Sequence, residues 1–214
     1  MTRTYYIIGT LLIAAVLAAT AVAYPHLPNT IPMHWDAHGN VNGWGAKGML
    51  FIDPGIMAGI LLLFVVLPWL SPKQFEMDSF RSTYLYIMVM ILTLVGYVHA
   101  LVLAAGLSMA IDMTRAVEGG LCLLIALLGN VLGKVRRNFY VGVRTPWTIA
   151  NEQVWNATHR FAAKTLFAGG LAGLVAVILR APFWLPIAAI LLGALIPVVY
   201  SLIFYKQLER TGAL

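Results

Sequence analysis

Long apolar segments alternate with short polar ones along the whole chain. The polar segments between them are rich in Gly, Pro or charged residues. A helix needs about 20 consecutive apolar residues to cross the hydrocarbon core of a bilayer. The pattern therefore predicts six transmembrane helices, at residues 5–23, 51–70, 84–106, 115–133, 161–179 and 183–205.

The first apolar segment also has features of a secretory signal peptide. Arg3 precedes it, and Ala21, Val22 and Ala23 form a small-residue ending. The apolar run is longer than the roughly 7–15 residues of a signal-peptide core. We therefore expect a retained transmembrane helix.

Composition supports the same class of protein. Apolar residues make up 61% of the 214 residues and charged residues only 10%, whereas a soluble domain carries about 25% charged residues. The expected fold is an all-α polytopic membrane protein with no large soluble domain. The single cysteine, Cys122, lies inside an apolar run, so an intrachain disulfide is excluded.

Positive charge is distributed unevenly between the predicted loops. Of 14 Lys and Arg residues, only Lys47, Arg115 and Arg180 lie on the side away from the N-terminus. Loops rich in Lys and Arg remain in the cytoplasm, which predicts cytoplasmic termini. The net charge of +6 is spread over several loops, so we expect contacts with membrane lipids and no direct binding of nucleic acid.

Two regions are expected. Residues 1–83 form an N-terminal two-helix region with an outer loop rich in His and Trp, and residues 84–214 form a four-helix region with a cytoplasmic basic loop at 134–160.

The outer loop, residues 24–50, contains many Pro and Gly residues and is predicted to be an ordered, turn-rich loop. His34, Asp36 and His38 offer two imidazoles and a carboxylate, which are ligands for a divalent metal. The alternative is that they hydrogen-bond the loop to itself and to lipid headgroups. Trp35 and Trp44 are expected at the membrane interface, where they can also contact a ligand.

Ionisable residues occur inside the predicted spans. At 1.5 Å per residue, His99 and Glu118 both fall in the outer third of the bilayer, with Asp53 just above them. Such groups mark a functional cavity by default. One hypothesis is a polar pocket lined by these three residues and roofed by His34 and His38. The alternative is a His99–Glu118 pair that only locks two helices together.

Three pairs of glycines, each four residues apart, predict close packing between helices of this chain. They are Gly55 and Gly59, Gly129 and Gly133, and Gly169 and Gly173.

The basic loop contains a segment with helical periodicity. Asn151, Trp155 and His159 recur at every fourth position and share one helix face. Thr145 or Thr148 is placed to cap such a helix. We predict an amphipathic helix on the inner membrane surface.

This loop resembles the signature of the SdpI-like family of bacterial membrane proteins. The matching positions are Asn138, Gly142, Arg144, Thr145, Pro146, Trp147, Thr148, Asn151, Glu152, Trp155, His159 and Arg160. The outer loop is similar to the uncharacterised N-terminal domain that often accompanies this family. Its matching positions are Ile31, Pro32, His34, Trp35, Gly39 and Trp44.

The resemblance implies a multi-pass protein of the bacterial inner membrane that acts in immunity and signal transduction. Such a protein binds or neutralises an antimicrobial peptide toxin at its outer face and draws a cytoplasmic repressor to the membrane. The signature residues of the basic loop would then hold that partner.

Two other hypotheses remain open. A membrane-embedded enzyme would use the histidines and carboxylates to hold a divalent metal and activate water, although no HExxH pairing or recognisable nucleophile is present. A small transporter is compatible with six spans and intramembrane ionisable residues, although no clear inverted repeat is visible.

Overall fold

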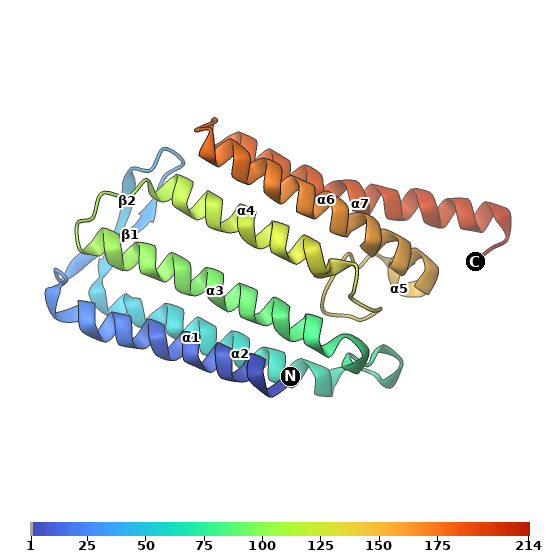
Figure 1. Ribbon diagram of the computed structural model, residues 1–214, viewed down its shortest axis with the longest axis horizontal. Helices are drawn as coiled ribbons and strands as arrows, with labels where there is room; N and C mark the ends of the chain where they lie inside the picture. The colour runs from blue at the N-terminus through green and yellow to red at the C-terminus, as the bar shows by residue number, and fades with distance from the viewer. Residues whose placement is uncertain (1) are drawn as a thin grey trace.

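Six long helices account for most of the computed structural model, which describes residues 2–214. They are α1 (Thr2–Ala23), α2 (Ile52–Leu70), α3 (Arg81–Gly106), α4 (Met113–Leu132), α6 (Glu152–Ile178) and α7 (Trp184–Thr211). All six are long and apolar enough to cross a membrane, and they run along one axis of the molecule (Figure 1). The prediction of an all-α fold with six membrane-spanning helices is confirmed.

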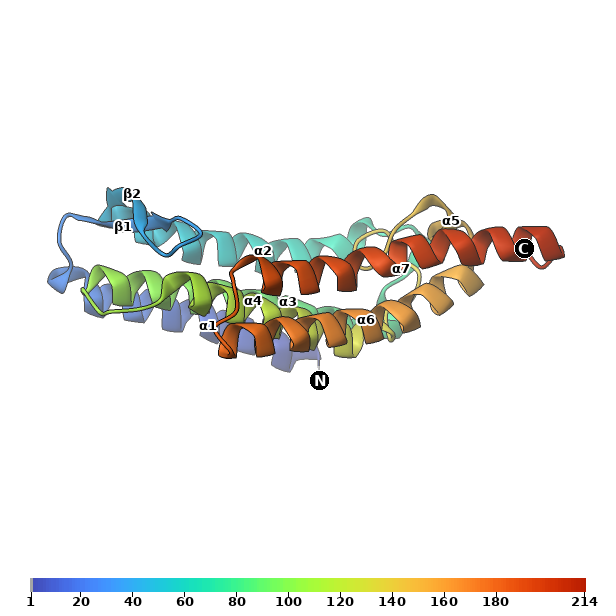
Figure 2. The same ribbon diagram turned by 90° about the horizontal axis from the view of Figure 1, so that it is seen from above.

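From α2 onward, each long helix packs against the next one in the chain, whereas α1 packs mainly against α3. α1 and α2 lie against α3, α3 contacts α4, and α6 lies between α4 and α7. A β-hairpin covers one end of the bundle, which we call the hairpin end (Figure 1). The opposite end, which we call the loop end, carries the short helix α5 (Pro146–Ala150) and the C-terminus. There α6 and α7 extend beyond the other helices (Figure 2).

The outer loop is more regular than predicted. Strands β1 (Thr30–Trp35) and β2 (Val41–Ala46) form an antiparallel hairpin with an irregularity at His34. The Asp36 carboxylate accepts hydrogen bonds from the backbone N–H groups of His38 (2.8 Å) and Asn40 (2.9 Å) and closes the tip. Gly39 has φ +84° there, a conformation that other residues rarely adopt. The turn residues that the sequence showed in this loop therefore connect the two strands of a hairpin.

Close helix packing through glycine is confirmed for the second and third pairs. A Cβ on Gly129 would lie 2.5 Å from the backbone N of Phe167, and one on Gly169 would lie 2.6 Å from the carbonyl oxygen of Ala189. The prediction is wrong for Gly55 and Gly59, because neither has a packing neighbour within 4 Å of a built Cβ. Both lie on the exposed face of α2, which turns Pro54 and Met57 inward instead.

Candidate functional site

A pocket of about 390 Å³ lies at the hairpin end. The hairpin, α3, α4 and α7 all contribute to it. It is lined by Met33, His34, Trp35, Asp36, Ala37, Val98, Val102, Met113, Thr114, Val117, Glu118, Phe183 and Ile187. We call it the hairpin pocket. Most of its walls are apolar, and Glu118 contributes a carboxylate from inside a membrane-spanning helix.

The hairpin is attached to the helices on two sides of this pocket. The Thr114 hydroxyl of α4 donates to the carbonyl oxygen of Asp36 at 3.3 Å. The His38 ring packs edge-on against Phe183, beside the start of α7, with ring centroids 5.9 Å apart. These contacts hold His34 and Trp35 over the pocket. Thr114 and Phe183 were not predicted, because their role depends on where the hairpin folds.

His99 does not contribute to the hairpin pocket. Its Nδ1 lies 3.0 Å from Oδ2 of Asp53, and its Nε2 lies 2.8 Å from the hydroxyl of Thr20. The predicted pair with Glu118 is therefore wrong. Successive residues of a helix point about 100° apart, so Val98 faces the pocket while His99 faces α1 and α2.

The triad of Thr20, Asp53 and His99 connects three helices, with Thr20 and His99 buried and Asp53 partly exposed. His99 is 1% exposed, and each of its ring nitrogens has a hydrogen-bonding partner. Thr20 also donates to the carbonyl oxygen of Val16 at 2.8 Å. Thr20 and Thr10 are the two threonines inside this apolar span, and only the folded arrangement shows which of them meets His99. The triad fits the alternative of a polar group that locks helices together.

The three candidate metal ligands do not converge. No group of three His, Cys, Asp or Glu side chains within residues 2–214 is arranged to hold a metal ion. The Nδ1 of His34 contacts the side-chain oxygen of Asn42, and Asp36 closes the hairpin tip. Hydrogen bonds from the backbone and side chain of Asn40 lower the pKa of the Asp36 carboxyl. The metal-site hypothesis for His34, Asp36 and His38 is replaced by hydrogen bonding within the loop.

Trp44 lies away from the pocket. Its side chain is 65% exposed on β2, whereas Trp35 lines the pocket from β1. Its location at the membrane interface stays a prediction.

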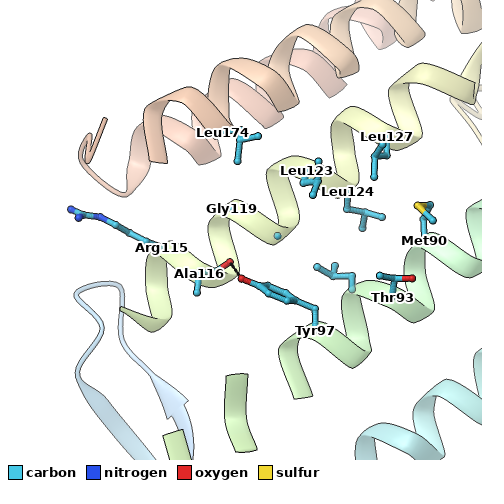
Figure 3. Close-up of a pocket in the computed structure, with 12 residues that line it drawn as sticks. Met90, Thr93, Tyr97, Arg115, Ala116, Gly119, Leu123, Leu124, Leu127 and Leu174 are labelled. Carbon is cyan, nitrogen blue, oxygen red and sulfur yellow. Dashed lines mark hydrogen bonds between the residues drawn. The ribbon is translucent and has the colours of Figure 1, made fainter. Parts of the chain in front are cut away.

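A second hollow, of about 380 Å³, lies between α3 and α4 and was not predicted (Figure 3). Its wall is formed by apolar side chains such as Leu123, Leu127 and Leu174, with Arg115 at the hairpin end. The Tyr97 hydroxyl donates to the carbonyl oxygen of Ala116 at 3.0 Å across it. A groove of this composition in a membrane-spanning segment suits lipid acyl chains.

At the loop end, the signature residue Asn138 organises a turn. Its side-chain oxygen accepts from the backbone N–H groups of Tyr140 and Val141, both at 2.7 Å, and its amide donates to the carbonyl oxygens of Arg136 and Val141. The side chain is fully buried. Asn138 therefore stabilises the loop and is not accessible to a partner.

Two further signature residues form a buried stack. The rings of Trp155 and His159 lie 3.9 Å apart. Nε2 of His159 accepts from the backbone N–H of Val143 at 3.0 Å, while Nδ1 lies 2.9 Å from the carbonyl oxygen of Trp155. A carbonyl can only accept, so Nδ1 carries the proton and the ring is neutral. Trp155 donates from Nε1 to the carbonyl oxygen of Val135 at 2.8 Å.

The prediction of a separate surface helix is wrong for this segment. Asn151 accepts from the backbone N–H of Val154 at 3.0 Å and caps α6, which continues without a break into the membrane span. The three residues do share one face, but Trp155 and His159 are buried by the loop. This face packs against the protein loop and not against the bilayer.

The Thr-Pro-Trp-Thr segment forms the one-turn helix α5. Thr145 and Thr148 cap it reciprocally. Trp147 donates from Nε1 to the Ser201 hydroxyl at 2.7 Å, which ties α5 to α7. Arg144 donates to the carbonyl oxygen of Phe139.

The signature residues differ in burial. Asn138, Thr148, Trp155 and His159 are buried and hold the loop together. Arg144, Pro146, Glu152 and Arg160 are exposed, and the other signature residues are partly buried. The exposed residues are the most accessible to a partner.

These features define a multi-pass membrane protein with a pocket at one end and a tightly bonded loop at the other. Residues 134–201 match the SdpI/YfhL protein family, and residues 11–58 match a domain of unknown function (DUF1648). The C-terminal part of the chain is therefore similar to the SdpI-like family of bacterial membrane proteins.

The similarity to one characterised relative covers both regions. The chain is 27% identical over 206 residues to a protein named Immunity protein SdpI from Bacillus subtilis (strain 168), covering 95% of this chain and 97% of the relative. No solved structure matches the chain.

Proposed function

We propose that this chain is a membrane immunity protein that binds an antimicrobial peptide in the hairpin pocket, at the outer face of the membrane. The observation that carries this proposal is the pocket itself, which opens beneath the hairpin and combines apolar walls with the Glu118 carboxylate. The similarity to an immunity protein over almost the whole of both chains supports the same function.

The pocket chemistry favours an amphipathic, cationic peptide. Glu118 has no hydrogen bond or ion pair to any other residue in the described chain 2–214. A carboxylate in apolar surroundings is costly unless a cation pairs with it. A Lys, Arg or terminal ammonium group of a peptide supplies that cation, while its apolar side chains fill the walls near Val102 and Ile187.

We further propose that the loop end contacts a cytoplasmic partner through its exposed residues. Phe139 is 40% exposed beside Arg144, and Glu152 begins α6 nearby. An exposed aromatic ring with charges of both signs suits a protein surface. The partner would be the cytoplasmic repressor that the family resemblance implies, and R144Q would weaken its recruitment without altering protection at the hairpin end.

A survival assay tests the immunity function. Expression of the wild-type protein in a sensitive bacterium should raise survival during challenge with cationic amphipathic peptides. We expect E118Q to lower the peptide concentration that the cells survive about tenfold, equivalent to a loss of about 1.4 kcal/mol of binding free energy. The matched control is E76Q, which removes an exposed carboxylate at the loop end.

Membrane levels of each variant are compared by immunoblot. Absence of protection by the wild type against every peptide would overturn the immunity function. Full protection by E118Q, at wild-type abundance, would remove the hairpin pocket as the binding site.

A further inference from the structure

A hollow of about 450 Å³ lies on α6 near the loop end, between the end of α4 and α7. Gly133 and Ala157 are small residues of its lining, and Phe161 and Tyr200 form an aromatic side, with ring centroids 4.6 Å apart. Arg160 completes the lining together with Lys164 and Ala163. Neither the hairpin pocket nor the buried loop residues contribute to it.

Its position along the bundle is level with the end of α4. Gly133 follows directly after the last residue of α4, whereas Arg160 lies eight residues inside α6. At 1.5 Å per residue, about 12 Å of α6 therefore extends beyond this level. Figure 2 shows α6 and α7 projecting past the other helices at this end. We infer that the hollow lies at the level where lipid headgroups meet the hydrocarbon core, because the other helices end there.

The charge of the hollow is positive and not neutralised. Arg160 and Lys164 are four residues apart, about 6 Å along the helix, and share one face. Both are exposed, and neither has a hydrogen bond or ion pair within residues 2–214. By contrast, Arg137 donates to the carbonyl oxygen of Ile149 at 3.2 Å, and Lys206 pairs with Glu209 at 2.7 Å.

No acidic side chain lines the hollow. A phosphate oxygen placed between the guanidinium and ammonium groups would receive charge-assisted hydrogen bonds from both. The adjacent aromatic side suits the glycerol and first methylenes of a lipid. We propose that this hollow binds the phosphate of an anionic phospholipid from the leaflet at the loop end.

The proposal is independent of the immunity function. It assigns a role to Arg160, a signature residue that the loop does not use for its own hydrogen bonds. A bound lipid here would fix the height of α6, and hence of the loop packed on it, relative to the membrane surface.

Thermal unfolding of the full-length protein in detergent tests the proposal. Short-chain phosphatidylglycerol should raise the Tm of the wild type more than the same concentration of phosphatidylcholine, because a ligand that binds the folded state stabilises it. We expect the double variant R160Q/K164Q to lose most of this difference. The matched control is R3Q/K73Q, which removes two exposed charges from other segments at the same end and should respond like the wild type.

Two further samples make the test decisive. R160K/K164R keeps both charges and should retain the phosphatidylglycerol response, even if the glutamine variant folds poorly. Inorganic phosphate alone should produce little shift. The proposal is overturned by equal responses to the two lipids, by an unchanged response in R160Q/K164Q, or by phosphate matching the effect of phosphatidylglycerol.

Discussion

The contact between Gly142 and His159 illustrates how single residues determine the loop end. Gly142 has φ +117°, and a Cβ built there would lie 2.1 Å from Nε2 of His159. That nitrogen accepts the backbone N–H of Val143. Glycine is therefore required twice, once for the backbone conformation and once for the space that the imidazole occupies.

Substitution G142A should destabilise the protein by about 2–4 kcal/mol. The change combines backbone strain with loss of a buried hydrogen bond. Thermal unfolding in detergent measures the effect. The control G59A, on an exposed face of α2 with open space around it, should unfold at or above the wild-type temperature. A wild-type Tm for G142A would contradict the proposed packing of His159.

At the scale of elements, α6 is the helix around which the C-terminal region assembles. Gly170 brings it against α4, since a Cβ there would lie 2.5 Å from the backbone N of Ala126. Gly169 and Gly193 bring it against α7 on another face. Close backbone approach replaces the hydrophobic driving force that is absent within lipid. The exposed part of α6 beyond α4 then carries the loop.

Substitution G170A should force α4 and α6 apart and destabilise the bundle by about 1–3 kcal/mol, because backbone atoms cannot move away as a side chain can. Its matched control is G55A, which adds the same methyl group to a helix with no neighbour within 4 Å. Chemical denaturation of both purified variants measures the difference. Equal stability of the two would show that the α4–α6 contact tolerates a larger separation.

At the scale of the whole molecule, the two ends carry different chemistry. The hairpin end has a pocket with a free carboxylate, and the loop end has the densest group of basic residues. The distribution of Lys and Arg predicts that the loop end and both termini are cytoplasmic. The proposed peptide site lies at the hairpin end, and the proposed lipid site lies near the loop end.

Cysteine labelling on intact cells tests the orientation. In a C122A background, which removes the buried thiol, A46C on β2 should react with a membrane-impermeant maleimide. A213C at the C-terminus should react only after the cells are opened. Both positions are exposed. The reverse pattern would invert the predicted topology and move the hairpin pocket to the cytoplasmic side.

The prediction of the site from sequence was partial. Glu118 and His34 were expected at one outer pocket and do line it, whereas His38 does not. His99 and Asp53 were expected there too, but they bond to each other and to α1. Depth along a helix follows from counting residues, whereas the direction in which a side chain points depends on the rotation of the helix against its neighbours.

The sequence alone determined that this is a six-span helical membrane protein with a motif similar to that of the SdpI-like family, because apolar length and a linear motif are local properties. The tertiary structure decided which signature residues are buried and which remain exposed. The motif places Trp155 and His159 on one face of a helix. Only the folded loop shows that this face is covered by protein. Burial arises from contacts between distant segments, and for that reason it could not be determined from the motif.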